Sequence, residues 1–278
     1  MSNYLLLIHC PDERGLVSQI TAALFQHGLN IVNNAEFVER NGNYFFMRTE
    51  FSGPFDETKL QQDLEALLPL TAVIKISSKQ KKDIVILATK EHHCISDLLV
   101  RHAFKELQAN VKAVISNYET LQDLTQKFGV PFHYIPHEGK SREEHEQEIT
   151  AVLELYDPEF IVLAKYMRIF SAAFTGRFIN RIINIHHSFL PAFIGAKPYN
   201  QAYERGVKII GATAHFVNDS LDEGPIITQD VTRINHSYNA KEMAQAGKDV
   251  ERLVLANALR LVLNEQVFVY RNTTIVFE

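Results

Sequence analysis

The sequence predicts an α/β protein of two domains: a ferredoxin-like βαββαβ domain, then a Rossmann-like domain whose sheet is mostly parallel. Residues 1–78 alternate strand and helix patterns in the order that defines the ferredoxin-like arrangement. The charged stretch Lys79–Lys82 then separates two apolar regions, which is typical of a domain boundary. After it, nearly continuous apolar runs alternate with amphipathic helical patterns, as expected for strands buried on both faces of a parallel sheet. These observations place the domains at residues 1–80 and 83–278.

The first domain begins with a strand and an amphipathic helix. The apolar run Tyr4–Cys10 predicts a strand that ends at Pro11. Asp12 is then positioned to cap a helix that Gly28 ends. The apolar positions of this helix recur at three- and four-residue steps, at Leu16, Val17, Ile20, Ala23 and Leu24.

A hairpin, a second helix and a fourth strand complete the first domain. Residues 31–38 and 43–51 are strand-like, and the Asn41-Gly42 pair between them is a strong hairpin signal. The second helix is expected to end before Pro69, and residues 71–76 supply the fourth strand. The apolar stripe of the second helix comprises Leu60, Leu64 and Leu67.

The second domain alternates strands with helices. Strands are predicted at residues 83–88, 111–116, 130–134, 160–164, 182–186 and 208–216. A long helical stripe covers residues 241–263, and a terminal hairpin about Arg271-Asn272 covers residues 266–277. This alternation indicates a sheet with helical connections on its faces.

The composition favours a protein of the cytoplasm that acts on a small molecule. Lys and Arg number 28 and Asp and Glu number 33, so the net charge of −5 leaves no broad cationic field for nucleic acid or anionic lipid. Cys10 and Cys94 are the only cysteines and have no zinc-type spacing, which fits a reducing compartment. No secretory signal and no membrane span are expected, because no apolar run is long enough for either.

A polar pair on a predicted buried strand is the first candidate site. If residues 182–186 form a strand, its two-residue period places Asn184 and His186 on one face and Ile183 and Ile185 on the other. At the carboxyl end of a strand in an open α/β sheet, such a pair borders the crevice in which ligands bind. The alternative is structural, with both side chains bonded to neighbouring loop backbone.

Three ordered segments together resemble the formyltransferase family that uses 10-formyltetrahydrofolate. The segments are Leu163–Ile169, Ile182–Pro191 and Ala214–Ile227. The resemblance implies a formyltransferase-type fold in the second domain. It also implies that Asn184, His186 and Asp222 are the catalytic residues.

The same resemblance implies a folate pocket around these three residues. The expected substrate-binding residues are Arg168, Ile169, Phe170, Asn218, Asp219 and Leu221. His215 lies on the predicted strand that leads to Asp222. It either lines the pocket behind the catalytic groups or is a satisfied core histidine.

The beginning of the chain resembles an ACT domain, a regulatory module that binds amino acids between copies. The resemblance rests on Cys10–Val17 and His27–Ile31 and implies an amino-acid effector, glycine or methionine, and a homo-oligomer. The expected effector-binding residues are Asp12, Arg14, Gly15 and Asn30. A glycine at a helix start lets a carboxylate approach exposed backbone N–H groups. The structural alternative is that Gly15 only turns the chain and Asp12 only caps the helix.

The domain order and the segment Ser188–Tyr199 resemble the formyltetrahydrofolate deformylases. Related enzymes that formylate a phosphorylated glycinamide carry a glycine-rich phosphate loop after the first strand of this domain. Here that place, Thr89–Ser96, has no glycine, so it lacks the residue type that lets backbone N–H groups close on phosphate. The resemblance therefore implies hydrolysis of 10-formyltetrahydrofolate to tetrahydrofolate and formate, which would supply purine synthesis and balance one-carbon pools. Two alternatives stay open: formyl transfer to an amine, and a non-catalytic sensor of folate and amino acids.

Hydrolysis of an N-formyl group needs an activated water, a donor for the oxyanion and a proton for the departing N10 atom. Asn184 offers an amide N–H, His186 exchanges protons near neutrality, and Asp222 can orient the imidazole and the water. These residue types leave open which of His186 and Asp222 first accepts the proton of the water. No cofactor is expected, because the folate is itself the substrate.

No metal is expected, because the histidines of the second domain match no zinc-ligand spacing. His92 and His93 have no assigned role. Cys94 is interpreted as a packing or pocket-lining residue, since neighbours along a strand do not share a face.

Overall fold

The computed structural model describes residues 3–192 and 198–278 and divides the chain into two compact units. The first comprises the chain up to Gln80 together with Phe277–Glu278, and the second comprises Lys81–Val276. Residues 193–197, which belong to the predicted motif Ser188–Tyr199, lie outside the described residues.

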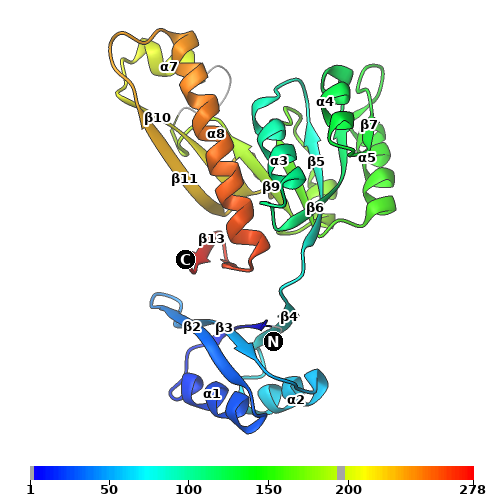
Figure 1. The fold of residues 1–278 in the computed structure, drawn as a ribbon. Helices are drawn as coiled ribbons and strands as arrows, with labels where there is room; N and C mark the ends of the chain where they lie inside the picture. Colours follow the sequence, from blue (N-terminus) through cyan, green and yellow to red (C-terminus); the bar gives the residue numbers. More distant parts are fainter. Residues whose placement is uncertain (1–2, 193–197) are drawn as a thin grey trace. The chain divides into compact units, whose positions relative to one another are not determined.

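The first unit has the predicted ferredoxin-like architecture. Its elements are β1 (Asn3–Pro11), α1 (Leu16–Gln26), β2 (Asn30–Glu39), β3 (Tyr44–Ser52), α2 (Glu57–Leu67) and β4 (Val73–Ser78). The strands form an antiparallel sheet in the order β2-β3-β1-β4, and both helices cover one face of it (Figure 1). The predicted hairpin joins β2 to β3, where Asn43 adopts a left-handed conformation.

Two details of this unit differ from the prediction. Helix α1 begins after Gly15, which has a φ of 90° and no side-chain cap, so the expected capping role of Asp12 is wrong. The backbone N–H of Asp12 donates instead to the carbonyl oxygen of Asn43, which ties this segment to the hairpin. Leu67 is 44% exposed, whereas Leu68 is buried, because the helix ends there and the chain turns inward.

The second unit contains a seven-stranded sheet. Its first half comprises β5 (Lys82–Ala88), α3 (His93–Ala103), β6 (Ala109–Ser116), the 3₁₀ turn η1 (Glu119–Leu121), α4 (Gln122–Lys127), β7 (Phe132–Tyr134), α5 (Arg142–Tyr156) and β8 (Phe160–Ala164). Its second half comprises α6 (Ala172–Arg177), β9 (Ile182–His186), α7 (Pro198–Glu204), β10 (Ile209–Phe216), β11 (Ile226–Arg233), α8 (Ala240–Leu263), β12 (Val267–Tyr270) and β13 (Thr273–Val276).

The strand order β11-β10-β9-β8-β5-β6-β7 confirms the mostly parallel sheet. Strands β5 to β9 pair in parallel, while β10 runs antiparallel to both of its neighbours. The sequence did not predict β11, because nearly all positions of this edge strand are at least partly exposed and its sequence has no long apolar run. The predicted terminal hairpin is formed by β12 and β13.

Helices cover both faces of this sheet (Figure 1). Strand β5 explains the continuous apolar pattern: Ile84 and Ile86 join the core under α3 and α8, and Val85 and Leu87 join the core under α5 and α6. Strand β5 pairs in parallel with β6 on one side and with β8 on the other. After β5 the chain extends the sheet through β6 and β7, and it then returns to the other side of β5 to add β8 and β9. Ligands of open α/β sheets bind at the carboxyl ends of strands beside such a switch point.

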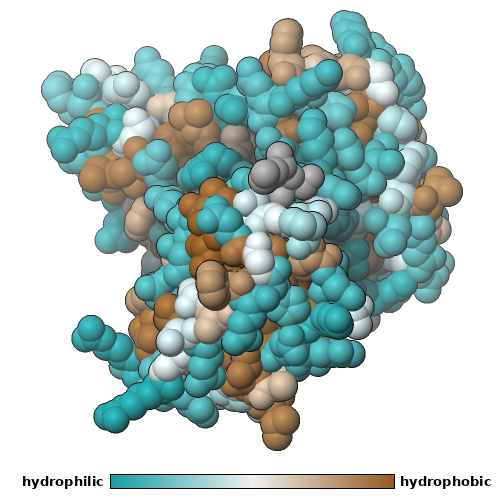
Figure 2. Space-filling model, turned by 60° about the horizontal axis from the view of Figure 1, so that its bottom comes forward, coloured by the Kyte–Doolittle hydropathy of each residue, from teal (hydrophilic) through white to brown (hydrophobic). Residues whose placement is uncertain are grey.

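The drawn surface of the protein is mainly hydrophilic (Figure 2). On the face drawn in Figure 2, apolar side chains form separate groups among hydrophilic ones. Over the described residues, every helix is too short or too polar to span a bilayer.

Candidate active site

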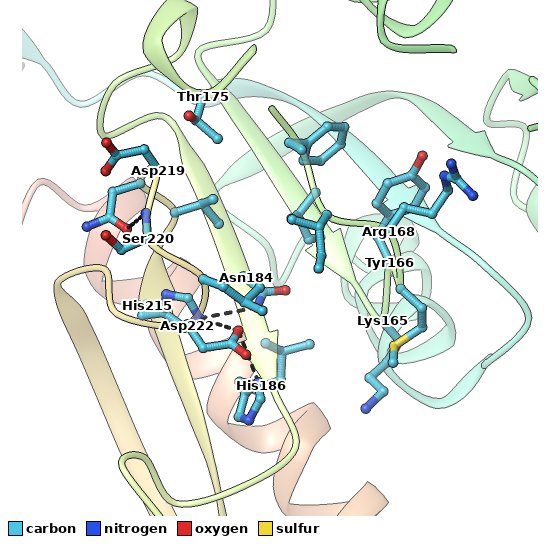
Figure 3. Close-up of a pocket in the computed structure, with 18 of the residues that line it drawn as sticks. Lys165, Tyr166, Arg168, Thr175, Asn184, His186, His215, Asp219, Ser220 and Asp222 are labelled. Carbon is cyan, nitrogen blue, oxygen red and sulfur yellow. Dashed lines mark hydrogen bonds and ion pairs between the residues drawn. The ribbon is translucent and has the colours of Figure 1, made fainter. Parts of the chain in front are cut away.

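A pocket of about 430 Å³ opens at the carboxyl ends of β8 and β9. The loop after β8 and the loop between β10 and β11 form its two walls, and Figure 3 shows Lys165, Tyr166 and Arg168 on the wall opposite Asp219 and Asp222. All predicted catalytic and substrate-binding residues line this pocket, namely Asn184, His186, Asp222, Arg168, Ile169, Phe170, Asn218, Asp219 and Leu221. His215 lines it as well.

The pairing of β9 with β10 brings the polar side chains together. Asn184 and His186 share one face of β9, as predicted, while Ile183 and Ile185 pack in the core under α8. In the antiparallel register Asn184 lies opposite His215, and His186 lies opposite Thr213. Directly opposite residues on one face are close enough for their side chains to interact.

The contact between Asn184 and His215 sets the orientation of the Asn184 amide. His215 Nδ1 lies 2.9 Å from the carbonyl oxygen of Phe216, so Nδ1 donates and Nε2 is left to accept. Asn184 Nδ2 lies 3.2 Å from that Nε2 and donates to it. Burial lowers the pKa of His215, which keeps the ring neutral in this role. One hydrogen of the Asn184 amide is therefore engaged, and the other remains available to a ligand.

The carboxylate of Asp222 orients His186. Asp222 Oδ1 lies 3.2 Å from His186 Nδ1 and 3.8 Å from His215 Nε2. Burial by itself would raise the pKa of Asp222, but the hydrogen bond from His186 and the nearby imidazoles lower it, so Asp222 stays ionised. With Nδ1 bonded to this carboxylate, His186 Nε2 is the basic nitrogen, and it is buried without a partner among the described residues.

The outer part of the pocket is apolar and suits a flat ring. Met167, Ile169 and Leu221 line it, although each is more than half exposed. The ring of Phe170 stacks on that of Tyr166 with centroids 5.4 Å apart. Exposed apolar side chains gathered at a cleft are typical of a ligand site.

Sequence reasoning missed three residues near the predicted catalytic residues: Lys165, His187 and Glu251. Lys165 and His187 line the pocket beside His186. Glu251 is 1% exposed on α8 and pairs with Lys165 at 3.2 Å. Its signal in the sequence was a charged residue within the apolar stripe of a long helix, where only apolar residues are expected.

His93 and Cys94, which follow β5, lie close to Glu251. His93 Nε2 lies 2.8 Å from Glu251 Oε2, and Cys94 is fully buried in the core under α8 and does not line the pocket. Among the described residues, His93, Cys94 and Glu251 form one group whose ligand atoms could meet on a metal ion. The Lys165 ammonium already neutralises Glu251, and burial raises the pKa of the Cys94 thiol far above neutrality. This charge distribution disfavours a divalent cation.

The predicted effector residues occupy two ends of the first unit. Asp12, Arg14 and Gly15 lie where β1 leads into α1, at the end of the sheet where Pro11 pairs with Tyr44. Asn30 lies at the opposite end, where it pairs with Ser52. One copy of the chain does not bring all four together.

Comparison with known proteins agrees with this geometry. A formyl transferase family model matches residues 82–259, and an ACT domain model matches residues 4–69. A formyltetrahydrofolate deformylase of Escherichia coli O6:H1 is 53% identical over 267 residues, which cover 96% of this chain and 95% of the relative. The chain belongs to the formyltetrahydrofolate deformylase family.

Solved structures extend this assignment from sequence to fold. A formyltetrahydrofolate deformylase from Pseudomonas syringae pv. tomato superposes with a TM-score of 0.95 and 37% identity, covering 100% of this chain and 95% of the other. A glycinamide ribonucleotide transformylase from Symbiobacterium toebii superposes with a TM-score of 0.68 and 26% identity, covering 72% of this chain and 95% of the other. The deformylase family thus shares its larger domain with enzymes named for a different acceptor.

Gly224 is expected to be essential for the geometry of this deformylase-family site. A Cβ atom at Gly224 would overlap the carbonyl oxygen of Phe216, which anchors His215. Gly224→Ala should therefore lower the free energy of unfolding by about 1–3 kcal/mol, measured by urea denaturation. The control is Gly176→Ala in α6, where no atom lies within 4 Å of the added carbon. Equal stability of the two variants would contradict the prediction.

Proposed function

We propose that this chain hydrolyses 10-formyltetrahydrofolate to tetrahydrofolate and formate in the pocket that contains Asn184, His186 and Asp222. The observation that carries the proposal is the buried Nε2 of His186, which has no partner among the described residues, while the other nitrogen is bonded to the Asp222 carboxylate. An imidazole held in this way is a general base for a water molecule. Membership in the deformylase family supports this reaction rather than another use of the same groups.

In the proposed mechanism, water attacks the formyl carbon while His186 Nε2 accepts a proton from it. The Asp222 carboxylate stabilises the imidazolium that forms, since it already receives the Nδ1 hydrogen. The free amide hydrogen of Asn184 donates to the oxyanion. The bond between carbon and N10 then breaks, N10 takes the proton from His186, and formic acid ionises to formate. The proposed mechanism uses no cofactor, because the folate is itself the substrate and His186 Nε2 is the base that activates the water.

The proposal assigns the first proton transfer to His186 rather than to Asp222. The pKa of Asp222 is lowered by its histidine partners against the effect of burial, so this carboxylate is a weak base. His186 Nε2 has no hydrogen-bond partner among the described residues, so it is free to accept the proton.

The folate is proposed to lie along the apolar part of the pocket. Arg168, Ile169 and Phe170 would contact it from the β8 side, and Asn218, Asp219 and Leu221 from the β10 side. Ser171 directly follows the pocket-lining residue Phe170, and its backbone N–H donates to Glu146 at 2.6 Å, which fixes this end of the β8 wall. A wall fixed in this way is preorganised for a planar ligand.

Formate release without an added amine tests the reaction. The purified chain should convert 10-formyltetrahydrofolate to tetrahydrofolate with one formate per turnover, because water is present at every turnover. Formate can be quantified by a coupled dehydrogenase assay. If the chain binds the folate but releases no formate, it is a sensor rather than a hydrolase.

The Asn184→Ala variant tests the oxyanion donor. It should lower kcat by about 10²–10³-fold, because the transition-state oxygen loses its hydrogen bond. The matched control is Asn110→Ala, whose amide donates to Asp83 on the protein surface and should keep the wild-type rate. A wild-type kcat in Asn184→Ala would show that this role is wrong.

The ACT domain is proposed to bind glycine or methionine between two copies of the chain. Asn30 and the Asp12–Gly15 turn lie at opposite ends of one sheet, so a ligand that contacts both needs residues from two copies. The backbone N–H groups after Gly15 start α1 without a side-chain cap, which leaves them available to a carboxylate. This arrangement supports a homo-oligomer.

Glycine or methionine is therefore expected to change the rate of formate release at millimolar concentration. Arg14→Ala should weaken this response without changing the basal rate, because Arg14 is exposed and lies beside the helix start. The control is Lys59→Ala, which removes another exposed cation of the same unit. An unchanged response in Arg14→Ala would remove this residue from the site, and no response in the wild-type chain would refute the regulatory role.

We also propose that the enzyme acts in the cytoplasm and that its formate supplies purine synthesis. Cys10 and Cys94 are both buried free thiols, which supports a reducing compartment.

A further inference from the structure

Beside the proposed catalytic groups lies a buried ion pair that the hydrolysis does not use. The Glu251 carboxylate on α8 accepts from three donors: His93 Nε2 at 2.8 Å, Lys165 Nζ at 3.2 Å and Tyr199 Oη at 2.7 Å. These hydrogen bonds and the Lys165 charge outweigh burial and lower the pKa of Glu251 to about 2. Glu251 is therefore an anion whose oxygens are all engaged, and it is unsuited to act as a base.

The surrounding backbone is shaped to hold this pair. Gly247 lies one turn before Glu251 on α8, and a Cβ there would overlap the Tyr199 hydroxyl, so glycine allows Tyr199 to reach the carboxylate. The backbone of Lys165 has a φ of 64°, which residues other than glycine rarely adopt. Its carbonyl oxygen accepts from Thr89 Oγ1 at 2.7 Å. The buried ion pair between Glu251 and Lys165 is expected to contribute little net stability to the fold. A strained residue in a functional pocket indicates that its position matters.

Lys165 and His187 form the pocket wall next to His186. The rings of His186 and His187 stack with centroids 4.9 Å apart, and the ring of Tyr199 follows at 6.3 Å from that of His187. Burial, Lys165 and His186 lower the pKa of His187 to about 4, so this imidazole is neutral. Lys165 and Arg168 are the cations that line the pocket. Of the two, Lys165 lies beside His187, and its Glu251 partner already accepts from three donors. Two carboxylates line the pocket itself: Asp222 is bonded to His186, and Asp219 is exposed on the wall opposite Lys165 (Figure 3).

We propose that Lys165, held in place by Glu251, determines the acceptor specificity by admitting water and rejecting amines at the formyl carbon. The inference rests on the proposed hydrolysis. Lys165 would exclude the competing reaction, in which the formyl group is transferred to an amine. A primary amine arrives near neutral pH mainly as an ammonium ion, which needs an anion in the site. Here it would meet the Lys165 ammonium instead, and like charges at close range are strongly disfavoured. Water is neutral and is not excluded.

The competing reaction transfers the formyl group from N10 of the folate to the amine. The amine nitrogen forms a bond to the formyl carbon, and the bond between that carbon and N10 breaks. The ammonium loses two protons in total, of which one ends on N10 and the other goes to solvent. The products are tetrahydrofolate and an N-formyl amide, so the two reactions differ in whether formate appears.

The Lys165→Met variant tests the proposal with glycinamide as the probe amine. Methionine keeps a long unbranched side chain but removes the cation and frees one position on the Glu251 carboxylate for an incoming ammonium. With millimolar glycinamide, the ratio of N-formylglycinamide to formate should rise at least about tenfold over the wild-type ratio, measured by mass spectrometry. This ratio does not depend on the folded fraction of the sample, because misfolding lowers both products equally.

Two further variants separate charge from packing. Lys248→Met removes another lysine of α8, which pairs with Glu91 at 2.7 Å, and should leave the ratio at the wild-type value. The double variant Lys165→Met with Glu251→Gln removes both charges. Its ratio should lie above that of the wild type, because the repulsion is gone, and below that of Lys165→Met, because no anion attracts the amine.

The proposal is overturned if Lys165→Met keeps the wild-type ratio, or if it is folded and loses both reactions, which would place Lys165 in the hydrolysis itself. If Lys165→Met does not fold, the double variant decides by the same ratio, and a wild-type value there overturns the proposal. Failure of the proposed function is distinguishable from these outcomes. It would appear as a wild-type chain that releases no formate when no amine is present.

Discussion

The antiparallel pairing of β9 with β10 is the constraint on which the site depends. It sets His215 opposite Asn184 and Thr213 opposite His186. Thr213 also fixes the segment that follows β9, since its hydroxyl donates to the Ser188 carbonyl oxygen at 2.9 Å and accepts from the Leu190 N–H at 3.0 Å. A shift of the register by one residue would turn these side chains to the other face of the sheet.

Two carboxylates in this region, the partly buried Asp222 and the fully buried Glu251, differ in their bonding partners. Asp222 is bonded to Nδ1 of an imidazole whose Nε2 has no partner among the described residues. Glu251 is bonded to a lysine, a histidine and a tyrosine, so its charge is permanently balanced. Both have a lowered pKa, but the unpartnered nitrogen of the Asp222 partner, His186 Nε2, belongs to a residue that lines the pocket, whereas His93 beside Glu251 does not line it. The partners of each carboxylate, rather than its burial, distinguish the two.

The order and type of most elements could be predicted because hydrophobic period and turn residues report local backbone preference. The strand at residues 160–164 and the strand at residues 182–186 have the predicted bounds. The errors occur where tertiary contacts override local signals. Asp12 has a capping side chain, yet its backbone is bonded to the hairpin, and the helix starts at Gly15. The edge strand β11 has a partner only on one side, so its sequence carries no continuous apolar run.

The sequence by itself determined the two-domain α/β order and the face shared by Asn184 and His186, because a strand has a fixed two-residue period. It also pointed to Asp222 through a recognisable motif. Only the tertiary structure decided that His215 orients the Asn184 amide, and that Glu251 and Lys165 meet beside His186. Those contacts join residues more than thirty positions apart in the chain. Strand register and helix packing set such distances, and no local pattern encodes them.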